Sequence, residues 1–305
     1  MRDQQWKKAV LAIITAAIIG GIAPVIAKIA LQTFSPLQTV LFRFAGASPF
    51  LVFLAWKFGL KWNLEPKSLL LLLGGGVLFA CNIVLFIFGI AQTTSVSSQL
   101  PYLLTPFVVM LWERIIFSLP IPRTQYVGCA LGLVGAAFLI LQGSGSLEMG
   151  SFTGNLLVTL AAFSWGTYLT YSKHITKNFS PLQLLTTNSV VTTLLVAPLA
   201  LPSLLGESEF LQTISSSAIL SMLFLIVINS IGMFFLYQWA LSKVSAVTVS
   251  SVFYLNPLVA ALFGGLLLGE SVTTPILVSA ILIGLGSYLS LIYSSKQPSQ
   301  KSAVK

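Results

Sequence analysis

The stretch Phe34–Gln38, which reads Phe-Ser-Pro-Leu-Gln, occurs again as Phe179–Gln183, 145 residues further along the 305-residue chain. The same offset pairs Lys28 with Lys173. Similarity at a fixed offset is the sequence signature of a duplicated structural unit. The chain is therefore predicted to consist of two related halves.

The later part of each half repeats at a slightly larger offset. Pro106 pairs with Pro257 at an offset of 151 residues, which implies a short insertion in the second half. We expect a first repeat over residues 1–145, a second repeat over 146–295 and a polar tail over 296–305.

The amino-acid composition indicates whether these halves face water or lipid. Hydrophobic residues make up 56% of the chain and charged residues only 8%, against about 25% charged in a soluble domain. So few charges cannot cover a water-facing surface, whereas lipid tails accept apolar side chains. The sequence predicts an all-α membrane protein with the lipid bilayer as its surroundings.

Apolar runs of about 20 residues, enough to cross a bilayer as a helix, follow one another along the chain. The ten predicted transmembrane helices are 9–31, 36–58, 68–91, 95–118, 123–142, 152–174, 181–205, 215–240, 245–268 and 274–294. Each half holds five of them. Because five is odd, the two repeats are expected to be inverted relative to each other in the membrane.

The basic residues give an independent test of this topology. Fourteen of the 16 Lys and Arg residues fall in the tails and loops on one side, and none falls in the five loops opposite. The remaining two, Lys28 and Arg43, lie inside the first and second spans. Cytoplasmic loops carry an excess of Lys and Arg, so both termini are predicted to be cytoplasmic. The formal charge of +9 is thus a topology signal and not a sign of nucleic-acid binding.

Inverted repeats give two packings of similar energy, each open to one side of the membrane, which is the usual basis of alternating access. The leading hypothesis is a secondary transporter. The alternatives are a duplicated scaffold, a non-transporting partner subunit, and an intramembrane enzyme or lipid-handling protein. An enzyme is disfavoured, because Glu113 is the only carboxylate inside a predicted span.

Several motifs resemble those of a known family. Ser164-Trp165-Gly166, followed by Lys173, resembles the opening helix of an EamA-type repeat, and Arg43 falls where that repeat carries its Arg. Asn256 to Glu270 is similar to its Pro-to-Gly-Glu helix. The chain is identified as a member of the drug/metabolite transporter superfamily. This resemblance implies two EamA repeats of five helices and efflux or exchange of metabolites, amino acids or drugs across an inner or plasma membrane.

The two halves depart from each other at several notable positions, and the fourth predicted span is followed by Leu119-Pro120 where the ninth is followed by Gly269-Glu270. The first half has Gly20 where the second has Trp165, and the second has Asn188 where the first has Arg43. These departures leave the substrate open.

Polar side chains inside spans are costly and are functional candidates by default. Asn82, Asn229 and Asn256 are therefore predicted to contact substrate. The alternative for each is a simple interhelical hydrogen bond of about 0.6 kcal/mol.

Aromatic side chains with a polar group form a second candidate set. Trp165 and Tyr168 follow one another at helical spacing, and Tyr102 and Tyr254 lie near the repeated prolines. Such rings can stack on a flat or apolar substrate and add one hydrogen bond. Tyr237 is instead a candidate for the interfacial aromatic belt.

Arg43 is the most deeply placed charge, and it is predicted to attract an anionic group such as a substrate carboxylate. The alternative is snorkelling to the headgroups. Pro106 and Pro257 each remove a backbone donor, so they are predicted to act as paired hinges or walls of the site.

No signal for a metal or cofactor is found. His174 is the only histidine, Cys81 and Cys129 lie inside apolar runs without a CxxC spacing, and no phosphate-binding loop occurs. Small residues in the fifth and tenth spans predict close packing of these two helices, with a homodimer face as the alternative.

Overall fold

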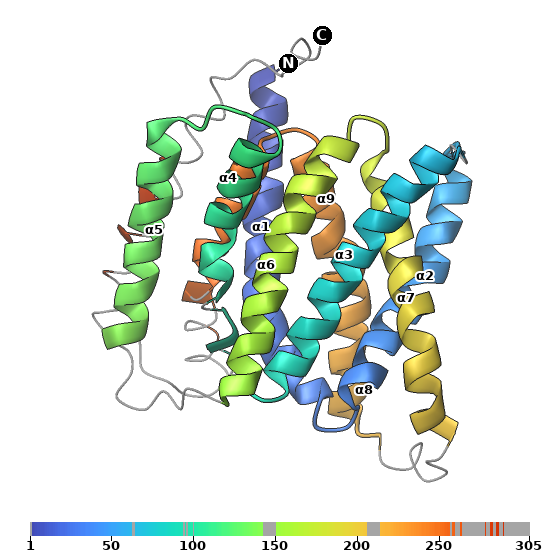
Figure 1. The fold of residues 1–305 in the computed structure, drawn as a ribbon. Coiled ribbons are helices and arrows are strands. Elements are labelled where there is room, and N and C mark those ends of the chain that lie inside the picture. Colours follow the sequence, from blue (N-terminus) through green and yellow to red (C-terminus); the bar gives the residue numbers. More distant parts are fainter. Residues whose placement is uncertain are drawn as a thin grey trace.

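A computed structural model describes residues 2–62, 65–93, 95, 97–99, 101–142, 151–205 and 214–256, with isolated positions between 258 and 289. Every regular element in this part is helical, and the helices form one bundle (Figure 1). The α-helices are α1 Arg2–Ala30, α2 Pro36–Lys57, α3 Pro66–Ile90, α4 Thr105–Ile115, α5 Arg123–Gln142, α6 Phe152–Ile175, α7 Pro181–Leu205, α8 Ser216–Leu223, α9 Phe234–Leu241 and α10 Ala246–Ser251.

Short helices of other types join them. The 3-10 helices are η1 Ser97–Gln99, η2 Pro101–Leu104 and η5 Val252–Tyr254, and η4 Phe224–Met233 is π-helical and links α8 to α9.

Five helices of the described part are long and apolar enough to cross a membrane: Gln4–Ala30, Pro36–Lys57, Pro66–Ile90, Pro181–Leu204 and Ser216–Leu241. Their bounds agree with the predicted first, second, third, seventh and eighth spans. The predicted fourth span is not one continuous helix, since η1 and η2 precede α4. The end of the ninth span, most of the tenth span, the boundary between the predicted repeats and the predicted tail lie outside the described residues.

The repeated pentapeptide forms the same helix start twice. Ser35 accepts a bond from the backbone N–H of Gln38 at 3.3 Å, and the Gln38 side chain accepts one from the Ser35 N–H at 2.9 Å. Ser180 and Gln183 make the same reciprocal bonds at 3.2 and 2.9 Å. This is a capping box, with proline at the first helical position, where its missing N–H costs nothing.

The two capping boxes lie at opposite ends of the bundle. The turn from α1 to α2 is at the lower end in Figure 1, and the turn from α6 to α7 is at the upper end. Consequently α1 and α6 run in opposite directions, although both are the first helices of their halves.

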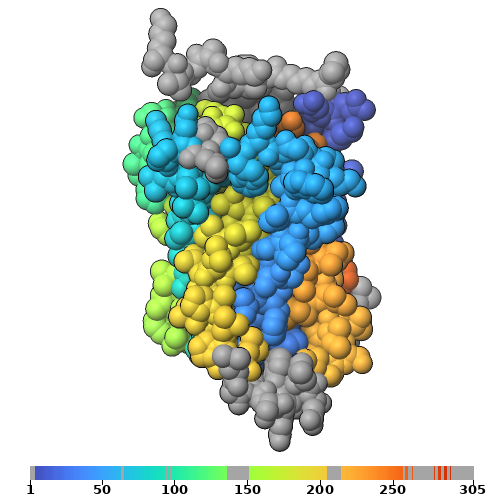
Figure 2. Space-filling model, turned by 90° about the vertical axis from the view of Figure 1, so that its right-hand side faces the viewer, coloured from blue at the N-terminus to red at the C-terminus, as the bar shows by residue number. Residues whose placement is uncertain are grey.

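Helices α2 and α7 lie side by side along one face (Figure 2). Near their middle, residues exactly one repeat apart meet: Ser48 contacts Thr193 at 3.2 Å, and Ser189 donates to the carbonyl of Phe44 at 3.3 Å. Each of these pairs is separated by the 145 residues of the pentapeptide repeat. Contacts between equivalent residues are what a two-fold relation produces on its axis.

Glycines allow other helices to approach closely. A Cβ on Gly89 of α3 would come within 2.5 Å of the Val158 side chain of α6. A Cβ on Gly286 would come within 2.5 Å of the backbone nitrogen of Gly132 of α5. The predicted packing of small residues between the fifth span and the tenth is thus seen within the chain at Gly286.

Lys57, Arg114 and Lys173 lie in the last turns of α2, α4 and α6, whereas Lys28 lies in the last turn of α1, at the opposite end of the bundle. Figure 1 shows α1 beginning, and α2, α4, α6 and α9 ending, at the upper end. There Lys173 caps α9 by donating to the carbonyls of Leu241 and Val244 at 2.8 and 2.7 Å. A lysine is favourable at a helix C-terminus because it satisfies carbonyls without an intrahelical partner.

Candidate functional site

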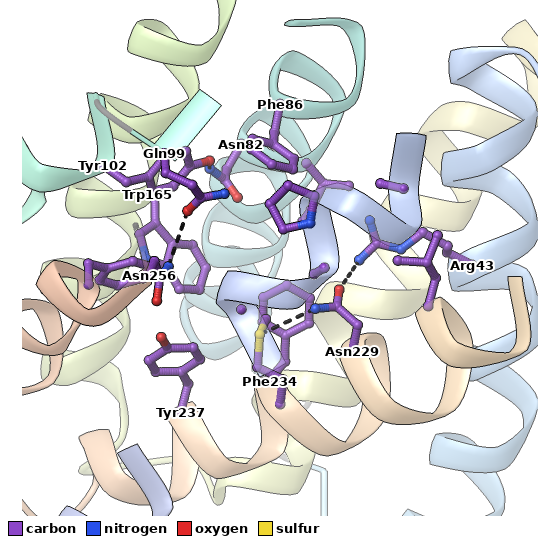
Figure 3. Close-up of a pocket in the computed structure, with 18 residues that line it drawn as sticks. Arg43, Asn82, Phe86, Gln99, Tyr102, Trp165, Asn229, Phe234, Tyr237 and Asn256 are labelled. Atoms are coloured by element: carbon purple, nitrogen blue, oxygen red, sulfur yellow. Dashed lines mark hydrogen bonds between the residues drawn. The ribbon is translucent and has the colours of Figure 1, made fainter. Parts of the chain in front are cut away.

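A cavity lies at the centre of the bundle, and both halves contribute to its wall (Figure 3). The side chains come from α1, α2, α3, η1, η2, α6, η4, α9 and η5. The space inside it that the centre of a water molecule can reach is about 70 Å³. That is several-fold below the roughly 300–1,000 Å³ of ligand pockets, so an organic substrate must widen the cavity to enter.

The structure brings most of the predicted site residues together here. Six of the eight substrate-binding candidates line the cavity: Arg43, Asn82, Tyr102, Trp165, Asn229 and Asn256. Tyr168 and Tyr254 are fully buried but are not part of the lining. Pro257 lies outside the described residues.

Pro106 has a different position from the one expected. The sequence places it inside a continuous fourth span, but the α-helix begins at Thr105, so Pro106 lies in the first turn of α4. Proline is well tolerated there. A different proline, Pro24 inside α1, lines the cavity. Pro24 was not among the predicted site residues. Its ring offers no N–H to the carbonyl of Gly20, four residues earlier, and Gly20 also lines the cavity.

Two amide pairs form one side of the cavity. Asn82 donates to the Tyr102 hydroxyl at 2.7 Å and to the carbonyl of Ala161 at 2.8 Å. Asn256 donates to the Gln99 side chain at 3.3 Å. These bonds join α3 to α6, and the first half to the second, so they orient the amides toward the lumen.

Arg43 lies on the other side and has only neutral partners in the described part of the chain. Its Nη2 donates to Asn229 Oδ1 at 2.5 Å, and its Nε donates to the Ser230 hydroxyl at 3.3 Å. The guanidinium also lies 5.2 Å from the ring centre of Phe44. It is 3% exposed, so snorkelling does not account for its position.

The partners of Arg43 belong to the π-helix η4. A π-helix is rare, and it occurs mostly at functional sites, because its wider turn reorients side chains. Asn229 and Ser230 therefore face α2 from a π-helical segment, and no sequence pattern predicts that this segment is π-helical. Ser230 was not a predicted site residue for this reason.

An aromatic wall faces Arg43 across the cavity. The Trp165 ring lies 5.8 Å from Phe234, 5.9 Å from Tyr237 and 6.1 Å from Phe253, measured between ring centres. Tyr237 is 2% exposed and lines the cavity, so its suggested place in an interfacial belt is wrong.

Tyr168 supports this wall from behind. Its ring stacks on Trp165 at 5.2 Å, and its hydroxyl accepts bonds from the side-chain amides of Asn188 and Gln238. Tyr254 packs against Gly132 of α5 instead, where a Cβ would come within 2.5 Å of its ring.

Three polar atoms of the lining are buried without a hydrogen-bond partner among the residues described: Trp165 Nε1, Tyr237 Oη and Asn256 Oδ1. A buried polar atom without a partner costs about 1–3 kcal/mol, so such atoms are rare and call for a ligand or water. No group of three or more His, Cys, Asp or Glu residues that could hold a metal ion occurs in the described ranges.

The cavity also lies between two contacts of repeat-equivalent residues. On one side are the α2–α7 contacts. On the other, Tyr102 and Phe253, which share the 151-residue offset of the repeated prolines, stack at 5.9 Å. A two-fold axis relating the halves would pass through both contacts and through the cavity.

Family comparison agrees with this duplicated architecture. The model of the EamA-like transporter family matches twice, over residues 7–141 and 152–292. The chain belongs to the EamA-like transporter family. It is an integral membrane protein and a transporter, as the family and its apolar helices show, and not an enzyme.

Individual relatives cover the whole length of this transporter. It is 25% identical to the uncharacterized transporter YcxC of Bacillus subtilis, covering 98% of both chains. It is 28% identical to a probable amino-acid metabolite efflux pump of Salmonella typhimurium, covering 90% of this chain and 91% of that one. A solved crystal structure with 15% identity aligns at a TM-score of 0.72 over 94% of this chain and 98% of that chain, which shows a shared fold.

Proposed function

We infer that this protein is a secondary transporter that moves small organic metabolites by alternating access, through ten transmembrane helices in two inverted repeats. The central cavity is its substrate site. Both termini face the cytoplasm, because 14 of the 16 Lys and Arg residues belong to one side of the predicted topology, and cytoplasmic loops carry such an excess. The Salmonella relative is a probable amino-acid metabolite efflux pump, which supports export of metabolites.

One observation carries this proposal: equivalent residues of the two halves meet on either side of the cavity. A site on the axis of an inverted repeat can open to either side by the same motion run in opposite directions. The cavity is also too narrow for an organic molecule in this conformation, so a change of shape must accompany binding.

The test is whether water reaches the cavity from both sides. Cys81 and Cys129 are first replaced by alanine, and Ala23→Cys then places a thiol in the cavity lining. The variant is reconstituted in oriented liposomes and treated with a membrane-impermeant thiol reagent from one side at a time. Ile18→Cys, near the middle of the same span but 41% exposed on the outer surface of the bundle, is the matched control.

Alternating access requires labelling of Ala23→Cys from both sides and of Ile18→Cys from neither. Labelling from one side only, in protein that also shows no flux with a broad metabolite panel, would overturn the proposal. In that case the duplicated bundle serves as a scaffold or a partner subunit.

A further inference from the structure

The two ends of the cavity differ chemically because the repeats differ at the positions that line it. Gly20 in the first half corresponds to Trp165 in the second, and both line the cavity. Arg43 in the first half corresponds to Asn188 in the second, which instead bonds to Tyr168. A nearly two-fold scaffold thus encloses a lumen with a cation at one side and aromatic rings at the other (Figure 3).

The charge of Arg43 is not neutralised by the residues that hold it. A guanidinium stays protonated at any relevant pH and has five N–H donors. Asn229 and Ser230 take two of them and carry no charge. A buried charge is costly unless it is paired, so Arg43 is set up to receive an anion.

The described lining offers no anionic side chain that could pair with a cation. The chain has only seven acidic residues, and none of the described residues that line the cavity is acidic. Glu113, which is buried on α4, is 3.7 Å from His174 and is not part of the lining. A ligand ammonium would meet amide oxygens and ring faces but no carboxylate, and it would share the lumen with the unneutralised charge of Arg43, which repels it.

The opposite end suits a flat apolar body that ends in a hydrogen-bonding group. The rings of Phe234, Tyr237 and Phe253 each lie 5.8–6.1 Å from the Trp165 ring, measured between ring centres, and supply faces and edges to a ligand. The unpartnered Trp165 Nε1 and Tyr237 Oη can donate, and the unpartnered Asn256 Oδ1 can accept.

We propose that the cavity selects small organic monocarboxylates that lack a free ammonium, with the carboxylate on Arg43 and an aromatic or apolar body against the Trp165 wall. This proposal rests on the cavity being the substrate site, and it narrows the substrate to one class. A planar carboxylate matches the fork of a guanidinium in two parallel bonds. A single arginine in an apolar lumen suits one negative charge and not two.

The test is a ligand series of one shape and four charge states, measured as thermal stabilisation of the detergent-solubilised protein. The series is 3-phenylpropionate, its neutral amide, phenylalanine and phenethylamine. A bound ligand raises the melting temperature by mass action, so the concentration dependence gives an apparent Kd. We expect 3-phenylpropionate to bind at least tenfold more tightly than phenylalanine or the amide, and phenethylamine not to bind.

Variants test whether Arg43 selects the carboxylate and whether the Trp165 wall binds the aromatic body of the ligand. Arg43→Gln should remove the preference for 3-phenylpropionate over its amide. Lys57→Gln, which removes the same charge from the exposed end of the same helix, should leave the preference unchanged. Trp165→Phe should weaken 3-(4-hydroxyphenyl)propionate more than 3-phenylpropionate, because only the former offers a group to the unpartnered atoms.

Binding and flux separate the two proposals. Tighter binding of phenylalanine or phenethylamine, or no binding across the whole series, overturns the carboxylate proposal, and because the ligand series uses the wild-type protein, this holds even if Arg43→Gln fails to fold. Flux of other metabolites with labelling from both sides would then leave the transport proposal standing.

Discussion

Removing one hydroxyl from Tyr168 and one from Tyr237 should have opposite consequences, although both side chains are buried in the same aromatic cluster. Tyr168 Oη accepts bonds from the amides of Asn188 and Gln238. Tyr237 Oη has no partner among the residues that the structure describes. The same Tyr→Phe change therefore removes two bonds in one case and none in the other.

The magnitudes follow from these partners. Interhelical hydrogen bonds in membranes average about 0.6 kcal/mol. The two bonds that Tyr168→Phe removes should therefore lower the free energy of unfolding by about 1 kcal/mol. Two amide donors left buried without acceptors raise the loss toward about 3 kcal/mol. Tyr168→Phe keeps the ring that stacks on Trp165, so its flux per folded molecule should be unchanged. Tyr237→Phe removes a buried hydroxyl that has no partner, so it should raise the free energy of unfolding by up to about 1–3 kcal/mol and weaken the binding of a ligand that bonds to this hydroxyl.

The free energy of unfolding is measured by titration with a denaturing detergent, and flux is measured in liposomes and normalised to folded protein. A double-mutant cycle of Tyr168→Phe with Gln238→Leu should give a coupling energy of about 0.5–1.5 kcal/mol, since the two changes break one shared bond. Loss of flux in Tyr168→Phe with unchanged stability would refute the reasoning, because Tyr168 would then contact substrate directly.

Three further changes test other parts of the structure. Ser35→Ala and Ser180→Ala should each lower the free energy of unfolding by about 1 kcal/mol, and by similar amounts, because they remove the same cap at opposite ends; clearly unequal losses would contradict the equivalence. Gly89→Ala should lower the free energy of unfolding by about 1–3 kcal/mol, because the added Cβ would come within 2.5 Å of the Val158 side chain of α6. An unchanged free energy in the same titration would mean that α3 and α6 can move apart to accept the methyl group. Pro24→Ala should slow flux and raise the free energy of unfolding, because it supplies the donor that the Gly20 carbonyl lacks; unaltered flux would remove any role in transport for the missing bond in α1.

Much of the architecture is encoded locally and is therefore legible in the sequence. Span bounds depend on runs of apolar residues, and the helix starts at Ser35 and Ser180 depend on residues within one turn. Six of the eight side chains predicted to bind substrate line the cavity, since a polar group inside a membrane helix is tolerated only where it faces the protein interior.

Other features depend on packing between distant segments and carry no local signal. The π-helix that brings Asn229 and Ser230 to Arg43 is one such feature. Another is that Trp165 lines the cavity, whereas Tyr168 packs behind it. A tyrosine or a tryptophan can occupy either position, so sequence spacing cannot distinguish a ring that lines the cavity from one that is buried behind it.

By itself, the sequence determined a duplicated helical membrane protein, most of the polar and aromatic residues that line its cavity, and the family. Only the tertiary structure decided which equivalent residues meet across the two halves, and which buried atoms are left without partners. The physical reason is that hydropathy and capping act over a few residues along the chain. Pairing of groups about 150 residues apart is fixed by how whole helices pack.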